Sequence, residues 1–168
     1  ILMTGYTGSA GMVKIYKNNG NNTFSPLNIN FPAITWSAAE WCDYNNDGYL
    51  DLIINSGVGV YKNNGDETFT FIDNLGLPSW TNRGFIDWGD YDNDGYIDLL
   101  STGGQQTAIY KNINGNSFVK QTQLNLTSAA VSAAAWGDYN NDGFLDIILT
   151  GKNLNSKKAR SSKLKVLF

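Results

Sequence analysis

Three short loops hold most of the acidic residues of the chain. Ten of the 15 Asp and Glu residues lie in the segments 43–51, 90–98 and 138–146, which we call the first, second and third aspartate loops. Each follows the pattern D-x-[DN]-x-D-G-x-x-D, so that side-chain oxygens recur at alternate positions. Alternate residues of a tight loop can direct their oxygens inward, and Ca²⁺ is bound by about six to eight hard oxygen ligands. The spacing therefore predicts one calcium site in each loop, three in all.

The expected ligands occupy the same five positions in each loop. Positions 1, 3, 5 and 9 supply side-chain oxygens, and position 7 supplies its backbone carbonyl. They are Asp43, Asn45, Asp47, Tyr49 and Asp51; Asp90, Asp92, Asp94, Tyr96 and Asp98; and Asp138, Asn140, Asp142, Phe144 and Asp146. Clustered carboxylates repel one another unless a cation neutralises them. A turn rich in Asp and Asn that binds no metal is the alternative for any single loop, but the threefold repetition favours calcium.

The rest of the composition leaves little chemistry for catalysis. The chain has no histidine, which excludes a Ser-His-Asp triad, a histidine general base and an HExxH zinc site. Its single cysteine, Cys42, excludes an internal disulfide and a CxxC site. The acidic residues outside the loops, such as Glu40 and Asp87, show no paired arrangement. We therefore expect a protein without enzymatic activity and name no catalytic residue.

The aspartate loops are spaced by an internal repeat. The first aspartates of successive loops, Asp43, Asp90 and Asp138, are 47 and 48 residues apart. A Tyr-Lys-Asn segment followed by Asn-Gly and a phenylalanine recurs between them, as at 61–69. The apolar residues alternate or form short runs, which is typical of strands, and Asn-Gly is the favoured two-residue hairpin turn. In one complete unit we predict four strands, at about 83–90, 96–102, 106–112 and 116–126.

Units of four strands that repeat every 40–50 residues indicate the blades of a β-propeller. The predicted fold class is all-β: a partial β-propeller with blades of four antiparallel strands, in which two complete blades are flanked by two incomplete ones. We expect one domain over residues 1–168, with blade segments at 1–32, 33–78, 79–127 and 128–168. Because these blades do not make a closed ring, we expect the sequence to be part of a longer chain; the alternative is that other copies of the chain cover its open edges.

Charge and hydropathy argue against two classes of partner. The net charge is −3, and half of the 12 basic residues lie among the last 17 residues. A basic tail can bind nucleic acid, but a solvated loop that leads into a strand is the favoured interpretation. No stretch approaches the ~18 apolar residues of a membrane-spanning helix. We expect neither a nucleic-acid partner nor a membrane span in this chain.

The tryptophans fall into two groups. Trp41, Trp88 and Trp136 each precede an aspartate loop by two residues, and this repetition indicates a packing role within or between blades. Trp36 and Trp80 do not repeat; we expect them beside the connections between blades, on the face opposite the aspartate loops. Aromatic planes suit the faces of sugars, so we name Trp36, Trp80 and Arg83 as candidate ligand contacts. The capping of an exposed edge is the alternative role.

The three WxDYxxDGxxD[LI] segments with their YKNNG-like hairpins resemble the FG-GAP/VCBS repeat family, the calcium-loop blades of integrin α-subunit propellers and of many bacterial surface proteins. The resemblance covers essentially the whole chain. It implies a propeller with Ca²⁺ in the loops between the first and second strands of the blades, an extracellular or cell-surface location, and a role in adhesion or in recognition of a glycan or protein ligand. Related propellers also include lectins and polysaccharide lyases, so a secreted lyase or hydrolase is the alternative function.

Overall fold

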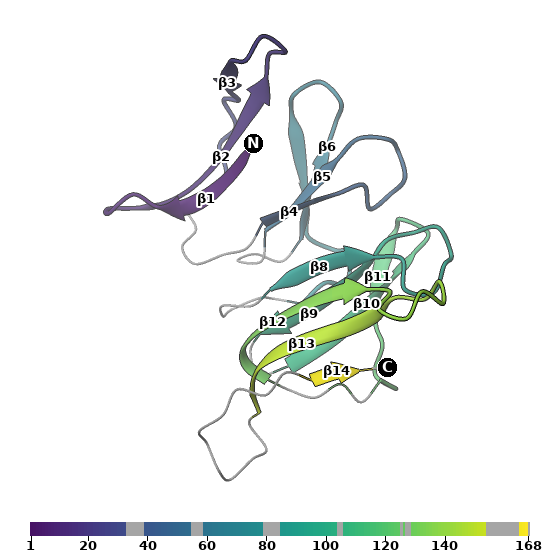
Figure 1. Cartoon of the computed structure of the whole chain (residues 1–168). Helices are drawn as coiled ribbons and strands as arrows, with labels where there is room; N and C mark the ends of the chain where they lie inside the picture. Colours follow the sequence, from purple (N-terminus) through teal and green to yellow (C-terminus); the bar gives the residue numbers. More distant parts are fainter. Residues whose placement is uncertain are drawn as a thin grey trace.

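The chain folds into β-strands arranged in four antiparallel sheets. The computed structural model describes residues 1–32, 39–54, 59–78, 85–103, 106–124, 126, 129–153 and 165–167. Every sheet is built from strands that are consecutive in the sequence, and the sheets follow one another in chain order (Figure 1). No helix among the described residues is long and apolar enough to cross a membrane. The predicted all-β fold is confirmed.

Two sheets of four strands lie between two sheets of three strands. The first sheet contains β1 (Leu2–Tyr6), β2 (Gly11–Asn18) and β3 (Phe24–Pro26), and the second contains β4 (Ala39–Cys42), β5 (Asp51–Ile54), β6 (Val60–Asn63) and β7 (Phe69–Ile72). The third sheet contains β8 (Ile86–Gly89), β9 (Asp98–Gly103), β10 (Gln106–Ile113) and β11 (Ser117–Lys120). The fourth contains β12 (Ala129–Gly137), β13 (Asp146–Asn153) and β14 (Lys165–Leu167). This is the predicted pattern of two complete blades flanked by two incomplete ones. The fourth strand of the third sheet is shorter than the predicted 116–126.

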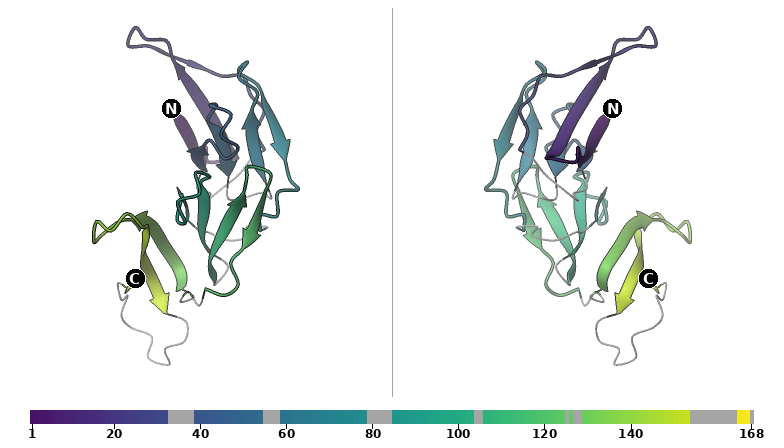
Figure 2. Two further views of the ribbon diagram at one scale, coloured as in Figure 1. Left: turned by 90° about the vertical axis from the view of Figure 1, so that its right-hand side faces the viewer. Right: turned by 90° about the vertical axis from the view of Figure 1, so that its left-hand side faces the viewer.

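The hydrophobic core is divided into three layers, each between two neighbouring sheets. Leu52 and Ile54 of β5 face the first sheet, whereas Ile53 between them faces the third sheet. In β9, Leu99 packs toward the second sheet and Leu100 toward the fourth. Strands buried on both faces need continuous apolar runs, which explains the short run after each aspartate loop. Figure 2 shows the four sheets side by side in chain order.

The repeated tryptophans pack in these layers, as predicted. Trp41, Trp88 and Trp136 contact the layers between the first and second, second and third, and third and fourth sheets. The ring of Trp136 stacks on Tyr91 of the preceding sheet, with 6.0 Å between ring centroids and 5° between planes. The tryptophans therefore join neighbouring blades.

The hairpin prediction holds at only one of its three positions. Asn114 and Gly115 have φ values of 52° and 71°, and the Asn116 N–H donates to the Ile113 carbonyl (3.0 Å), so Asn-Gly forms the centre of a β-turn as predicted. The register pairs Ile113 with Ser117, which leaves three residues between the strands. In the first sheet, the Asn19 N–H instead donates to the Thr23 carbonyl (3.0 Å), and the loop at Asn64 is closed in the same way (3.1 Å). The prediction was wrong there because Asn side chains form local turns of their own. Asn18 Oδ1, for example, accepts a bond from the Gly20 N–H (2.9 Å).

Gly89, which ends β8, shows how tightly the blades approach one another. A Cβ atom at Gly89 would lie 2.6 Å from Leu145 Cδ1 and 2.9 Å from Trp136 Cδ1, both in the next blade. Gly137 occupies the same repeat position at the end of β12, and a Cβ atom there would meet nothing within 4 Å. In the second sheet this position holds Cys42, which is 3% exposed and belongs to the core layer next to the third sheet.

We predict that Gly89→Ala destabilises the protein by about 1–3 kcal/mol, because the added methyl group forces the blades apart or moves Trp136. The matched variant Gly137→Ala should change the free energy of unfolding by less than about 0.5 kcal/mol. Chemical denaturation of both variants and the wild type measures this. Equal stabilities of the two variants would contradict the tight contact at Gly89.

Candidate metal centres

The three aspartate loops connect the first and second strands of their sheets and share one backbone conformation. In each loop the carboxylate of the first aspartate accepts bonds from the N–H groups of positions 5 and 6. In the second loop, Asp90 accepts from Asp94 (3.0 Å) and Gly95 (2.8 Å). The corresponding distances are 3.1 and 2.9 Å in both other loops. Position 6 is glycine with φ near 90° in every loop, a conformation that disfavours other residues.

In the first and second loops, the aspartate at position 9 is buried at the base of the loop. Asp51 and Asp98 are both 0% exposed. Asp98 Oδ1 accepts a bond from the Asn112 N–H in β10 (2.8 Å), and its Oδ2 accepts one from the Tyr91 N–H (3.1 Å). Asp51 Oδ1 accepts from the Asn63 N–H in β6 (2.7 Å). Each carboxylate therefore ties the loop to the third strand of its own sheet.

Burial changes the acidity of these two groups. Loss of hydration raises the pKa of Asp51 to about 6, against the opposing effect of the bond from the Asn63 N–H. Burial likewise raises the pKa of Asp98 to about 6, against the N–H bonds, with a further increase from Asp92 and Asp94. Without a compensating cation, the first and second loops each hold a carboxylate that ionises with difficulty.

Carboxylate oxygens converge most closely in the second loop. Oxygen atoms of Asp90, Asp92 and Asp98 all lie within 4.8 Å of one another. In the first and third loops, where position 3 is Asn45 or Asn140, the described residues form no such group of three. Two buried oxygens, Asp92 Oδ1 and Asp51 Oδ2, have no hydrogen-bond partner of ordinary geometry among the described residues. Such oxygens are costly unless a cation takes them up, so the donor set fits a hard divalent metal.

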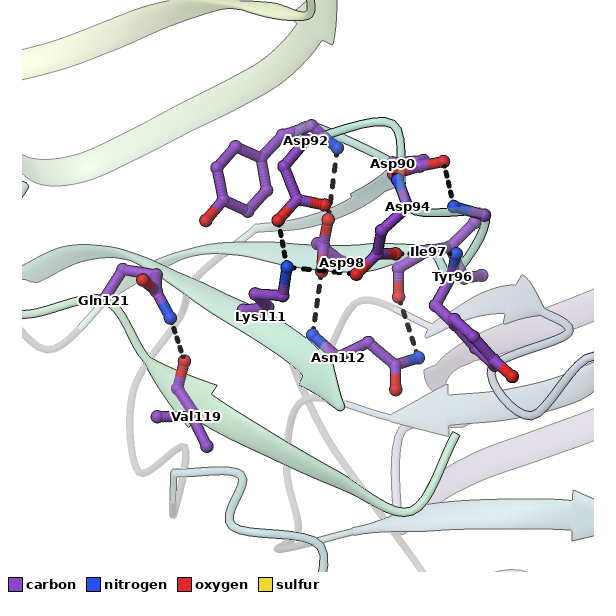
Figure 3. Close-up of polar contacts among 12 residues, drawn as sticks. Asp90, Asp92, Asp94, Tyr96, Ile97, Asp98, Lys111, Asn112, Val119 and Gln121 are labelled. Carbon is purple, nitrogen blue, oxygen red and sulfur yellow. Dashed lines mark hydrogen bonds and ion pairs between the residues drawn. The ribbon is translucent and has the colours of Figure 1, made fainter. Parts of the chain in front are cut away.

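Lysines from the third strands contact two of the loops. Lys111 Nζ in β10 pairs with Asp92 and lies 3.0 Å from Asp94 Oδ2 (Figure 3). Lys62 Nζ in β6 lies 3.1 Å from Asp47 Oδ2. These contacts were not predicted, although the pairing of the second and third strands accounts for the contact of Lys111. Leu99 pairs with Tyr110, so the adjacent residue Lys111 falls opposite Asp98 across the strands.

Asparagines link the second loop to its neighbours, and sequence analysis also missed them. Asn46 Nδ2 donates to the Gly95 carbonyl (2.9 Å), and Asn93 Nδ2 donates to the Gly143 carbonyl (3.0 Å). Each donor is the fourth residue of one loop, and each acceptor is the sixth residue of the next. Buried Asn112 donates to the Tyr44 carbonyl (2.7 Å), which adds a second side-chain bond between the second and third blades. The loops therefore lie next to one another along one rim of the blades.

The structure brings only some of the predicted site residues together. The side chains of Asp90, Asp92 and Asp98 come together in the second loop, whereas the ligand sets predicted for the first and third loops stay predictions. The backbone-carbonyl role of Tyr49, Tyr96 and Phe144 stays a prediction; their N–H groups donate to the aspartate at position 5. The candidate ligand contacts Trp36, Trp80 and Arg83 lie outside the described residues.

The raised pKa values of Asp51 and Asp98 predict an unusual pH dependence for metal-free protein. The folded state holds these two protons up to about pH 6, whereas an unfolded aspartate releases its proton near pH 4. The folded state thus binds more protons across this window, and the free energy of unfolding should fall as pH rises from about 4.5 to 6.5. The fall should amount to about 1–3 kcal/mol per group.

Melting temperatures in metal-depleted buffers between pH 4.5 and 7 measure this dependence. Asp98→Asn is the matched variant, since an amide oxygen still accepts the Asn112 N–H bond but carries no titrating proton. Its melting temperature should depend less on pH than that of the wild type. A metal-free stability that rises steadily over this range would show that the buried carboxylates are not protonated in the folded state.

Comparisons with known proteins agree with the repeat architecture. The chain spans about half of a structurally similar Agrocybe aegerita lectin, described as specifically recognising non-reducing terminal N-acetylglucosamine. The superposition has a TM-score of 0.61 and 19% identity, and covers 98% of this chain and 52% of the lectin. No curated protein matches the sequence. The FG-GAP-like repeat profile matches residues 1–54, 55–101 and 90–149. The chain therefore belongs to the FG-GAP-like repeat family.

Proposed function

We propose that this chain is a calcium-stabilised, non-catalytic β-propeller module of a secreted or cell-surface protein, which acts in adhesion or ligand recognition. The observation that carries the proposal is the geometry of the aspartate loops. Three loops share one conformation, and aspartate oxygens converge in the second. In the first and second loops a buried carboxylate oxygen lacks a hydrogen-bond partner of ordinary geometry among the described residues. Family membership supports the same assignment.

The donor chemistry favours Ca²⁺ over other metals. All the candidate ligand atoms are oxygens from carboxylates, amides and backbone carbonyls, which are hard ligands. The chain has no histidine and one cysteine, so it lacks the usual nitrogen and sulfur ligands of zinc. When bound, Ca²⁺ would supply positive charge to the loops, and Asp51, Asp98 and Asp146 would hold it at the loop bases.

The extracellular location is proposed from the family resemblance, and the affinity expected of such a module is compatible with it. Calcium modules outside the cell typically bind at about 10⁻⁴–10⁻³ M, where extracellular calcium keeps them loaded. The lysines that already contact the first and second loops support an affinity in this weak range.

We predict that millimolar Ca²⁺ raises the melting temperature of the wild-type chain. Binding to the folded state alone stabilises it by about 2.7 kcal/mol at a hundredfold excess over Kd, and by less near Kd. Thermal melts at pH 7.5 in EDTA, in 5 mM Mg²⁺ and in about 5 mM Ca²⁺ measure the effect. Mg²⁺ should stabilise less, because it requires a smaller octahedral cage. Identical melting temperatures in EDTA and in Ca²⁺ would contradict the proposal.

A glycan is the ligand class that we propose for recognition. The support is the structural similarity to a lectin together with the candidate aromatic contacts Trp36 and Trp80. A glycan array that includes terminal N-acetylglucosamine, probed in Ca²⁺ with wild type and Trp80→Ala, tests this class. Binding that the variant loses supports it, whereas no binding to any glycan directs the search to protein ligands. Depolymerisation of a polysaccharide by the wild type would instead favour the lyase or hydrolase alternative.

A further inference from the structure

The lysine of the repeated Tyr-Lys-Asn segment has a different partner in each sheet. Lys111 pairs with Asp92 and Asp94 of the second aspartate loop, and Lys62 pairs with Asp47 of the first. Lys17, at the same repeat position in β2, pairs instead with Glu67 on the neighbouring sheet. Among the described residues, no lysine pairs with the third loop, and the sequence has Phe168 at the corresponding repeat position.

The lysine ammonium groups form ion pairs with carboxylate oxygens that a bound metal would use as ligands. Asp92 and Asp47 are expected metal ligands at positions 3 and 5, and each gives an oxygen to a lysine. These ion pairs are only partly hydrated, with the Lys111 and Asp92 side chains 28% and 27% exposed. The Lys17–Glu67 pair is 55% and 56% exposed and includes no residue of an aspartate loop. Exposed pairs of that kind contribute little to stability.

We infer that Lys111 and Lys62 act as tethered counter-cations, which neutralise the second and first aspartate loops when metal is absent and compete with Ca²⁺ when it binds. The inference rests on the proposed calcium function. It divides the loops into two classes: two have a built-in competitor that lowers their calcium affinity, and the third has none among the described residues. The lysines thus set the calcium concentrations at which the first and second loops fill.

The charge of Lys111 gives the direction and size of the effect. A unit positive charge about 4 Å from a second cation weakens its binding by at least about fivefold in water, and by more where hydration is incomplete. Lys111→Met keeps the length and apolar stem of the side chain but removes the charge. It should therefore strengthen Ca²⁺ binding to the second loop at least about fivefold. In chelator the same variant should melt at a lower temperature than the wild type, because its loop carboxylates are left without a counter-cation.

Calcium titrations followed by the amide resonances of Gly48, Gly95 and Gly143 test the inference, since each of these N–H groups donates to the first aspartate of its loop. Lys111→Met should shift the Gly95 titration to lower Ca²⁺ more than the other two, and Lys62→Met should shift the Gly48 titration most. The Gly143 curve is the internal reference. Lys17→Met is the matched control and should leave all three curves unchanged.

The possible results distinguish a failure of the counter-cation role from a failure of the proposed calcium function. If the wild type binds Ca²⁺ but Lys111→Met and Lys62→Met leave the affinity of their loops unchanged or weaker, the counter-cation role is overturned and the calcium function stands. If no loop of the wild type responds to Ca²⁺, both are overturned. Titrating two variants in separate loops keeps the test decisive if either one fails to fold without metal.

Discussion

A buried carboxylate at the base of each complete blade's aspartate loop ties the blade together. Asp98 accepts N–H bonds both from Tyr91, where the loop begins, and from Asn112 in the third strand. Asp51 makes the corresponding bond to Asn63. Removing a charge from water is expensive, and here several more carboxylates lie close by. The blades therefore depend on positive charge at their loops, which Lys62 and Lys111 supply in part and which Ca²⁺ would supply more fully.

Packing between blades places these loops beside one another. Because β5 and β9 bury apolar side chains on both faces, each complete blade needs a neighbour on either side. That packing brings the sixth residue of one loop within reach of the fourth residue of the preceding loop, and the Asn46 and Asn93 bonds result. Gly95 illustrates the coupling, since its N–H donates a hydrogen bond to Asp90 and its carbonyl accepts one from Asn46. The order of one loop is thus connected to that of the next.

Most of the fold could be predicted from the sequence because its determinants are local and repeated. The aspartate spacing and the apolar runs after it recur, so strand order and loop positions follow directly. The contacts of Lys111 with Asp92 and of Asn112 with Tyr44 could not be predicted in this way, since they join residues 19 and 68 positions apart. The turn at Asn19 was missed although its hydrogen bonds join residues that are close in the sequence. The side chains of neighbouring asparagines compete with the backbone for the same hydrogen bonds, and a two-residue pattern does not reveal which wins.

The central claim is that the aspartate loops are cation sites, and counting bound calcium tests it most directly. The wild-type chain, equilibrated at neutral pH with Ca²⁺ well above the expected Kd, can be analysed by native mass spectrometry alongside the variant Asp90→Ala. The account predicts three Ca²⁺ ions per wild-type chain and two per variant chain. A wild-type chain that carries no specifically bound Ca²⁺, or a variant that carries as many ions as the wild type, would contradict it.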